Sequence, residues 1–153
     1  MSAETRLREL AIELPAAPTP LGAYVEAVQT GNLLFVSGTL PIVDHQPRFV
    51  GRLGEEYQVE EGREAARIAT LNALAIAKKH LGSLDKVTRV VRLGVSIATA
   101  PSFREHPKIA DGASELLVSI FGQEKISTRL VFGVASLPLG TTVEIEVILE
   151  VEA

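Results

Sequence analysis

Arg129 and Glu144 carry the side chains best suited to chemistry in this chain of 153 residues. Arginine can bind a substrate carboxylate through two parallel hydrogen bonds, and a nearby glutamate can take a proton from water. Each residue lies in a segment with β-strand alternation, 127–135 and 143–151, and a turn with proline and glycine joins the segments. A hairpin of these strands would place Arg129 and Glu144 together on the face away from the core. The alternative is a cross-strand ion pair, which contributes ~0.2–1 kcal/mol and no chemistry.

Other polar groups gather earlier in the chain, at the expected ends of two strands. The hydroxyls of Tyr24 and Ser37 can orient a small polar substrate, and Gly38 and Thr39 follow directly. Taken alone, each has a simpler interpretation. A tyrosine is often a half-buried packing residue, and a Ser-Gly pair is often a turn in which the glycine serves backbone geometry.

Composition excludes several classes of function. The net charge is −4, which offers no electrostatic footprint for nucleic acid or an anionic membrane. There are no cysteines, and the three histidines lack ligand-like spacing, so we expect no disulfide, thiolate nucleophile or metal site. No apolar run approaches a membrane span, and the N-terminus lacks the order of a signal peptide. A cytoplasmic protein with no membrane partner is expected.

Periodicity and turn signals predict a mixed order of elements. The expected helices cover residues 5–14, 59–81 and 107–121, and the expected strands cover 24–29, 33–37, 87–98, 127–135 and 143–151. Residues 39–58 are expected to form a loop with one short strand near Phe49. Residues 1–20 are interpreted as an N-terminal helix and Pro-rich linker, and residues 21–153 as a single domain.

This order favours an α+β fold, a mixed β-sheet with two long helices on one face. Two helices can cover only one side of such a sheet. Yet the segments 33–36 and 90–91 are apolar on both faces, as in strands that are buried on both sides. The simplest partner that could bury the second face is another copy of the chain in a closed symmetric oligomer. That assembly would place Arg129 and Glu144 near a subunit interface.

Two motifs resemble signatures of a known family. Gly22-x-Tyr24 with Gly31-Asn32-Leu-Leu-Phe-Val-Ser37-Gly38-x-x-Pro41 resembles the N-terminal signature of the RidA (YjgF) family of enamine/imine deaminases. Thr128-Arg129 with Val134-x-x-Leu137-Pro138-x-Gly140-x-x-Val143-Glu144-Ile145-Glu146 resembles its C-terminal signature. The resemblance runs from about Leu21 to the end of the chain, and the second motif is the more specific.

The resemblance implies a chorismate-mutase-like homotrimer with active sites between subunits, and a role for each matching residue. Arg129 would bind the carboxylate of a 2-imino acid, and Glu144 would hold and activate the attacking water. Tyr24, Ser37, Gly38 and Thr39 would belong to the substrate pocket, and the backbone carbonyl of Val131 would help to place the water. No metal or organic cofactor is required.

The chain also departs from the family pattern. Val131 stands where the family often has cysteine, and Thr39 where glutamine is common. The family's helix asparagine has no clear counterpart near Asp111-Gly112. With the added N-terminal helix, the chain resembles a longer subgroup whose substrate pocket can differ.

Three functions follow from these observations. The first is a hydrolytic deaminase that converts reactive 2-imino or enamine acids into 2-oxo acids and ammonia. The second is a non-catalytic module that binds small carboxylates through Arg129. The third is an endoribonuclease, an activity also attached to parts of this family, against which the net acidity weighs.

Overall fold

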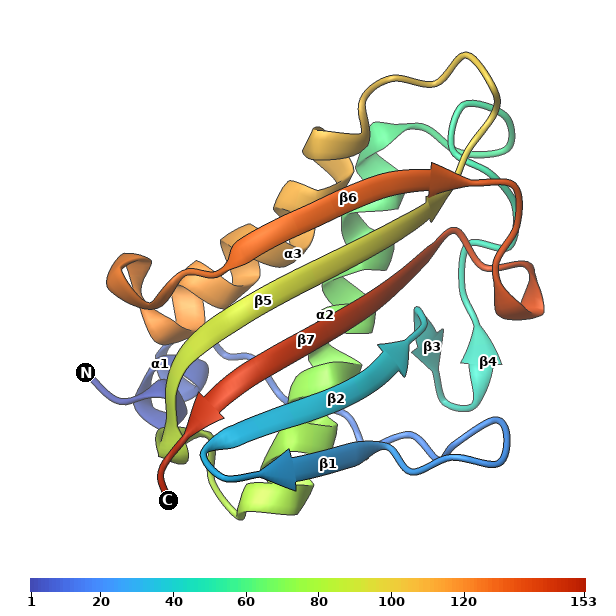
Figure 1. Cartoon of the computed structure of the whole chain (residues 1–153). Coiled ribbons are helices and arrows are strands. Elements are labelled where there is room, and N and C mark those ends of the chain that lie inside the picture. The colour runs from blue at the N-terminus through green and yellow to red at the C-terminus, as the bar shows by residue number, and fades with distance from the viewer.

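The computed structural model describes residues 1–153 and is built around one mixed β-sheet (Figure 1). Its strands are β1 Ala27–Thr30, β2 Leu33–Thr39, β5 Val87–Ala98, β6 Thr128–Val134 and β7 Val143–Val151. They lie in the order β1-β2-β7-β5-β6, and only β5 and β6 run parallel. In β7 the side chains of Val143, Ile145 and Val147 are buried, and Glu144 between them lies on the opposite face.

Two long helices, α2 Val59–Leu81 and α3 His106–Phe121, cover one face of the sheet (Figure 1). The buried side of α2 is rich in alanine, which lets the helix lie close to the strands. It ends at Gly82, which has the left-handed backbone (φ 87°) of a typical helix terminus. The two helices also approach each other closely, because a Cβ at Gly112 of α3 would lie 2.9 Å from the Cα of Arg63.

The N-terminal helix α1 spans Ala3–Glu9, so it begins and ends earlier than the expected 5–14. It stops because Ala11 takes a left-handed backbone (φ 54°), and the Ile12 N–H then donates to the Leu7 carbonyl. Ile12 still packs against the core from the extended chain beyond the helix, and Ala3 and Leu7 belong to that same core.

The segment 39–58 is more ordered than a loop with one strand. Two short strands, β3 Ile42–Val43 and β4 Gln46–Pro47, form a separate ribbon. The strand expected near Phe49 is reduced to an isolated bridge between Val50 and Thr141. Three 3-10 turns complete the chain: η1 Leu84–Lys86, η2 Gln123–Lys125 and η3 Pro138–Gly140.

The hairpin expected between the last two long strands is wrong, because β5 lies between β6 and β7 (Figure 1). The helix α3 connects β5 to β6 as a parallel crossover, and β7 then pairs with the other edge of β5. Arg129 is paired in register with Leu93, whose side chain is buried under the helices. Arg129 therefore lies on the helix side of the sheet and Glu144 on the other side.

The second face of the sheet is uncovered in the single chain, as the sequence predicts. Large apolar side chains are exposed there, including Phe35 (39%), Leu130 (49%) and Phe132 (49%). None of the helices is both long and apolar enough to cross a membrane.

The close crossing of α2 and α3 gives a test of the packing. Gly112→Ala would push a methyl group against the backbone of Arg63, which cannot rotate away as a side chain can. Overpacking of this kind costs ~1–3 kcal/mol, more than alanine gains in helix propensity. We expect a lower midpoint in chemical denaturation, while Glu64→Ala on the exposed side of α2 leaves it nearly unchanged. An unchanged midpoint for Gly112→Ala would contradict the tight crossing.

Candidate functional site

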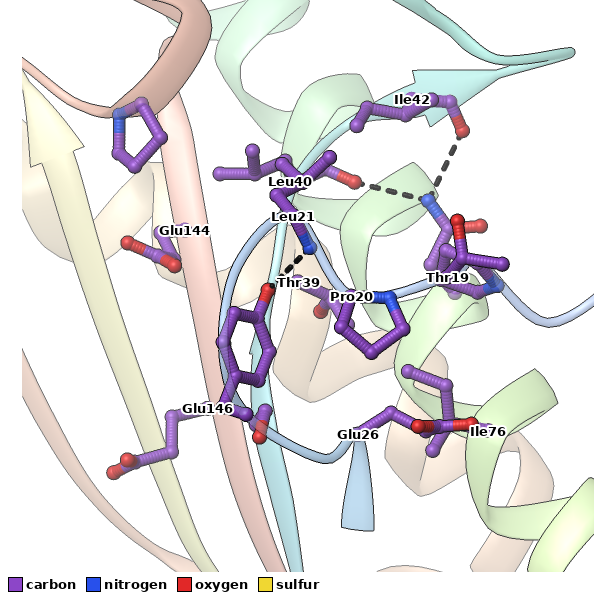
Figure 2. Close-up of a pocket in the computed structure, with 16 residues that line it drawn as sticks. Thr19, Pro20, Leu21, Glu26, Thr39, Leu40, Ile42, Ile76, Glu144 and Glu146 are labelled. Atoms are coloured by element: carbon purple, nitrogen blue, oxygen red, sulfur yellow. Dashed lines mark hydrogen bonds between the residues drawn. The ribbon is translucent and has the colours of Figure 1, made fainter.

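A cavity of about 560 Å³ opens beside β2 and β7, between α2 and the chain segment 18–24 (Figure 2). Its walls combine apolar side chains with hydroxyls, one amide and several carboxylates. The lining residues are Pro18, Thr19, Pro20, Leu21, Tyr24, Glu26, Ser37, Gly38, Thr39, Leu40, Ile42, Asn72, Ile76, Pro138, Glu144 and Glu146.

Glu144 is the half-buried carboxylate of this cavity, and it lies over the backbone of Gly38. A Cβ at Gly38 would overlap the Glu144 carboxylate, so the absence of a side chain there makes room for it. Gly38 belongs to an irregular stretch of β2, where the register against β7 shifts between Val36 and Thr39. Burial raises the pKa of Glu144 above its ordinary value, and the nearby charge of Glu146 raises it further. The geometry therefore favours the protonated form of this group and makes its carboxylate a stronger base.

The cavity is acidic. It is lined by the carboxylates of Glu26, Glu144 and Glu146 and by no lysine, arginine or histidine. Figure 2 shows Glu144 and Glu146 on one strand and Glu26 across the cavity, beside Ile76. These charges repel an anion, and no basic side chain of the cavity offsets them.

Two of the carboxylates have cations outside the cavity. Glu26 lies 3.4 Å from Lys79. Glu146 lies 3.6 Å from Arg92, which borders an adjoining hollow of about 340 Å³ on the open face of the sheet. Glu144 lines both spaces and has no ion-pair partner.

The hydroxyls singled out in the sequence are partly engaged by the chain itself. The Tyr24 hydroxyl oxygen accepts from the Leu21 N–H at 3.0 Å, which leaves its own proton free to donate. The Ser37 hydroxyl donates to the Val25 carbonyl at 2.7 Å and so holds the segment that carries Tyr24.

Thr39 differs from these two, because its hydroxyl is buried. It donates to the Ala69 carbonyl of α2 at 2.8 Å and so ties the end of β2 to the helix. In this chain the Thr39 hydroxyl therefore positions the strand that carries Gly38.

Sequence reasoning missed Asn72, which is buried in α2 beneath the cavity. Its side-chain amide donates to the carbonyls of Leu40 and Ile42, at 2.9 and 3.0 Å, and fixes the chain that leaves β2 (dashed lines, Figure 2). The available signal was an amide side chain on the buried, alanine-rich face of α2.

Arg129 does not line the cavity of its own chain. Its Nη1 donates to a carboxylate oxygen of Asp111 at 2.7 Å and to the hydroxyl of Ser114 at 3.2 Å, both on α3. Val131 lies on the same side of the sheet and is also outside the cavity. The expectation that Arg129 and Glu144 share one face is wrong for the single chain, because Arg129 pairs with the core residue Leu93 and Glu144 pairs with Ser96 of the opposite face.

No cluster of three or more His, Cys, Asp or Glu residues in the chain could hold a metal ion. The polar side chains that line the cavity are hydroxyls, carboxylates and the Asn72 amide.

Comparison with known proteins identifies the family. A family model described as "YjgF/chorismate_mutase-like, putative endoribonuclease" matches residues 4–151. Protein TCP17 of Trypanosoma cruzi is 43% identical over 145 residues, which cover 94% of this chain and 91% of that protein. A 2-iminobutanoate/2-iminopropanoate deaminase of Dermatophagoides farinae is 32% identical over 142 residues, which cover 92% of this chain and 95% of that protein.

A solved structure has the same fold along nearly the whole chain. The crystal structure of a "putative endoribonuclease" from Shewanella oneidensis MR-1 has a TM-score of 0.95 and 34% identity, covering 99% of this chain and 100% of that one. This chain belongs to the YjgF/RidA family and has its chorismate-mutase-like α+β fold. The resemblance drawn from the two sequence motifs is thereby confirmed.

The raised pKa of Glu144 predicts a pH dependence of stability. The folded state holds this proton more tightly than the unfolded chain does, so the stabilising contribution is complete below the unfolded pKa. It is lost as the pH rises through the folded pKa. Glu144→Gln should therefore raise the melting temperature relative to wild type at neutral pH, and the difference should vanish in acid.

Thermal melts of both proteins from acid to neutral pH measure this difference in melting temperature. Glu64→Gln, on the exposed side of α2, is the control and should show no such trend. A wild type that gains stability over Glu144→Gln as the pH rises would contradict the raised pKa.

Proposed function

We propose that this protein is a hydrolytic deaminase that converts 2-imino or enamine acids into 2-oxo acids and ammonia. The observation that carries the proposal is the half-buried Glu144 carboxylate, which has a raised pKa and a place at the cavity wall over Gly38. A carboxylate with a raised pKa is a stronger base toward water than an exposed glutamate. Family membership and the deaminase relative at 32% identity support the same reaction.

The reaction needs little beyond positioning and one proton acceptor. A protonated imine carbon is already electrophilic, so the ionised Glu144 takes a proton from water as the water oxygen bonds to that carbon. The C=N π electrons move to nitrogen and leave a neutral amine on a tetrahedral carbon. Glu144 then returns the proton to this amine, the hydroxyl oxygen forms the carbonyl, and ammonia leaves with the hydroxyl proton as ammonium.

The substrate carboxylate needs a cation that the cavity lacks, and Arg129 of a second copy is our candidate. The cavity presents three carboxylates and no basic residue, which would repel an acidic substrate. Arg129 lies on β6 at the edge of the sheet, where another chain has access to it. We therefore propose a homotrimer in which Arg129 of one copy faces Glu144 of the next. The open face with Phe35 and Phe132 would be covered in this assembly.

The remaining residues take supporting roles in this proposal. Tyr24 keeps a free hydroxyl proton that can donate to the substrate, and Ser37 holds the Tyr24 segment in place. Gly38 admits the Glu144 carboxylate. The backbone carbonyl of Val131 would accompany Arg129 from the second copy and help to place the water.

An endoribonuclease is the function that the family description and the Shewanella relative name. The cavity of this chain does not favour it, because three carboxylates repel a phosphodiester and no histidine is present for general acid or base chemistry. The non-catalytic carboxylate-binding module shares Arg129 with the deaminase and differs in having no use for Glu144.

Substitution of Glu144 separates catalysis from binding. We expect Glu144→Gln to lower kcat for 2-imino acids by about 100-fold or more, since general base contributions are typically of this size. The binding of a stable 2-oxo acid should be retained, because the carboxylate is held elsewhere. The imines are generated by an amino-acid oxidase, and residual imine is trapped with semicarbazide. Turnover that is equal in wild type and Glu144→Gln would reject the deaminase mechanism.

Substitution of Arg129 tests the origin of the cation. Arg129→Ala should raise KM at least tenfold, because a bidentate arginine–carboxylate contact is lost. Arg92→Ala is the matched control, since Arg92 lies near Glu146 on the open face and belongs to the same chain as the cavity. If Arg92→Ala raised KM and Arg129→Ala did not, the cation would come from the same chain and the proposed pairing of two copies would fail.

A further inference from the structure

The contacts of Arg129 involve only one of its three nitrogens. Nη1 donates to both Asp111 and Ser114, and Nε and Nη2 have no hydrogen-bond partner in the chain. The two acceptors are three residues apart on α3 and therefore lie side by side on one face of that helix. The Arg129 side chain is 27% exposed, so the unpaired nitrogens can be reached from outside the chain.

This pattern leaves one particular edge of the guanidinium available. A guanidinium can bind a carboxylate bidentately along its Nη1–Nη2 end or along its Nε–Nη2 side. Nη1 already donates to two acceptors on α3, so the Nη1–Nη2 end has only one nitrogen left to donate to a ligand. The Nε–Nη2 side still has both of its nitrogens free to donate. An arginine that is held in this way has already lost the rotamer freedom that ligand binding would otherwise remove.

We propose that Asp111 and Ser114 are positioning residues that hold the Arg129 guanidinium by Nη1 and turn its Nε–Nη2 side toward the substrate carboxylate. This inference rests on the proposed function of Arg129, and it assigns to α3 a role in substrate binding without contact to the substrate. It also gives a purpose to the carboxylate of Asp111 near an anion-binding site, where its charge would otherwise weaken binding.

The exposure of the pair argues for orientation rather than stability. The Arg129 and Asp111 side chains are 27% and 46% exposed, and ion pairs as exposed as this contribute little to folding. The same helix carries a comparable ion pair that does not involve Arg129, between Glu115 and Arg63 of α2 at 2.7 Å. Glu115→Ala therefore serves as a control that removes an ion pair of α3 without freeing Arg129.

The first experiment measures binding without turnover. Pyruvate, a stable 2-oxo acid, is titrated into wild type, Asp111→Ala/Ser114→Ala, Asp111→Asn and Glu115→Ala in a calorimeter. We expect about tenfold weaker binding for the double variant, because Nη1 loses both acceptors. Asp111→Asn keeps an acceptor oxygen at the same place and should bind within about threefold of wild type, and Glu115→Ala should be unchanged.

The second experiment separates the effect on KM from the effect on kcat. The double variant should raise KM for a 2-imino acid about tenfold and leave kcat within about twofold, because the chemistry takes place at Glu144. Melting temperatures of the double variant and Glu115→Ala should both lie within about 4 °C of wild type. In NMR spectra of the arginine side chains, the Nη1 protons of Arg129 should exchange slowly in wild type and rapidly in the double variant.

Several results would overturn the inference. The first is a double variant whose KM and pyruvate affinity match those of wild type. The second is a double variant that binds pyruvate more tightly, which would show that Asp111 competes with the substrate for Arg129. The third is an Asp111→Asn variant in which pyruvate affinity and melting temperature both fall as far as in the double variant, which would indicate a structural role. Rapid exchange of the Nη1 protons in wild type also contradicts it.

Failure of the proposed function gives a different pattern. If the wild type hydrolyses no 2-imino acid but still binds pyruvate, and this binding weakens in Arg129→Ala and in the double variant, the deaminase fails and the positioning role stands. If imine hydrolysis is normal and the double variant keeps its KM, only the positioning role fails.

Discussion

The pairing of β5 with β6 on one edge and β7 on the other determines where every functional side chain lies. Leu93, Val95 and Ile97 of β5 are buried beneath the helices, and this hydrophobic burial is the dominant stabilising term of the fold. Once that face is the core, the register sends Arg129 to the helix side through its pairing with Leu93. It sends Glu144 to the open side through its pairing with Ser96. The sheet itself therefore divides the two residues best suited to chemistry.

The cavity depends on a second constraint, the close packing of β2 against β7. Gly38 leaves space for the Glu144 carboxylate, and the buried hydroxyl of Thr39 anchors the same stretch of β2 to α2. Asn72 holds the chain beyond it. A carboxylate confined in this way is partly removed from water, which raises its pKa and makes it a useful base. No basic residue of the same chain lines the cavity, so no ion pair within the chain offsets this rise in pKa.

Much of the fold follows from local patterns in the sequence. The bounds of α2, β5 and β7 agree with alternation, helical periodicity and the glycine after α2, because each element carries a strong apolar pattern. The early end of α1 could not be predicted in this way, since Ala11 takes a left-handed backbone that alanine rarely adopts. The order of the strands was also missed, because a seven-residue connection can close a hairpin or pass over a neighbouring strand, and local pattern does not distinguish them.

The candidate site could be predicted only in part from the sequence. Tyr24, Ser37, Gly38, Thr39 and Glu144 line one cavity, but the hydrogen bonds that engage the Ser37 and Thr39 hydroxyls depend on tertiary contacts. The partners of Arg129 on α3 were missed for the same reason, because Asp111 and Ser114 precede it by 18 and 15 residues. Alternation alone placed Arg129 on the wrong face, since it does not say which of the two faces of β6 packs against the helices.

The central claim is that Glu144 of one copy works with Arg129 of another. It is tested most directly by mixing two impaired variants, Arg129→Ala and Glu144→Gln, through unfolding and refolding together, with activity measured at a substrate concentration well below KM. A site between copies is intact when its arginine comes from the Glu144→Gln chain and its glutamate from the Arg129→Ala chain. In a randomly mixed closed oligomer this holds for about one site in four. The account predicts imine hydrolysis at about a quarter of the wild-type rate. Activity no higher than that of the separate variants would contradict it.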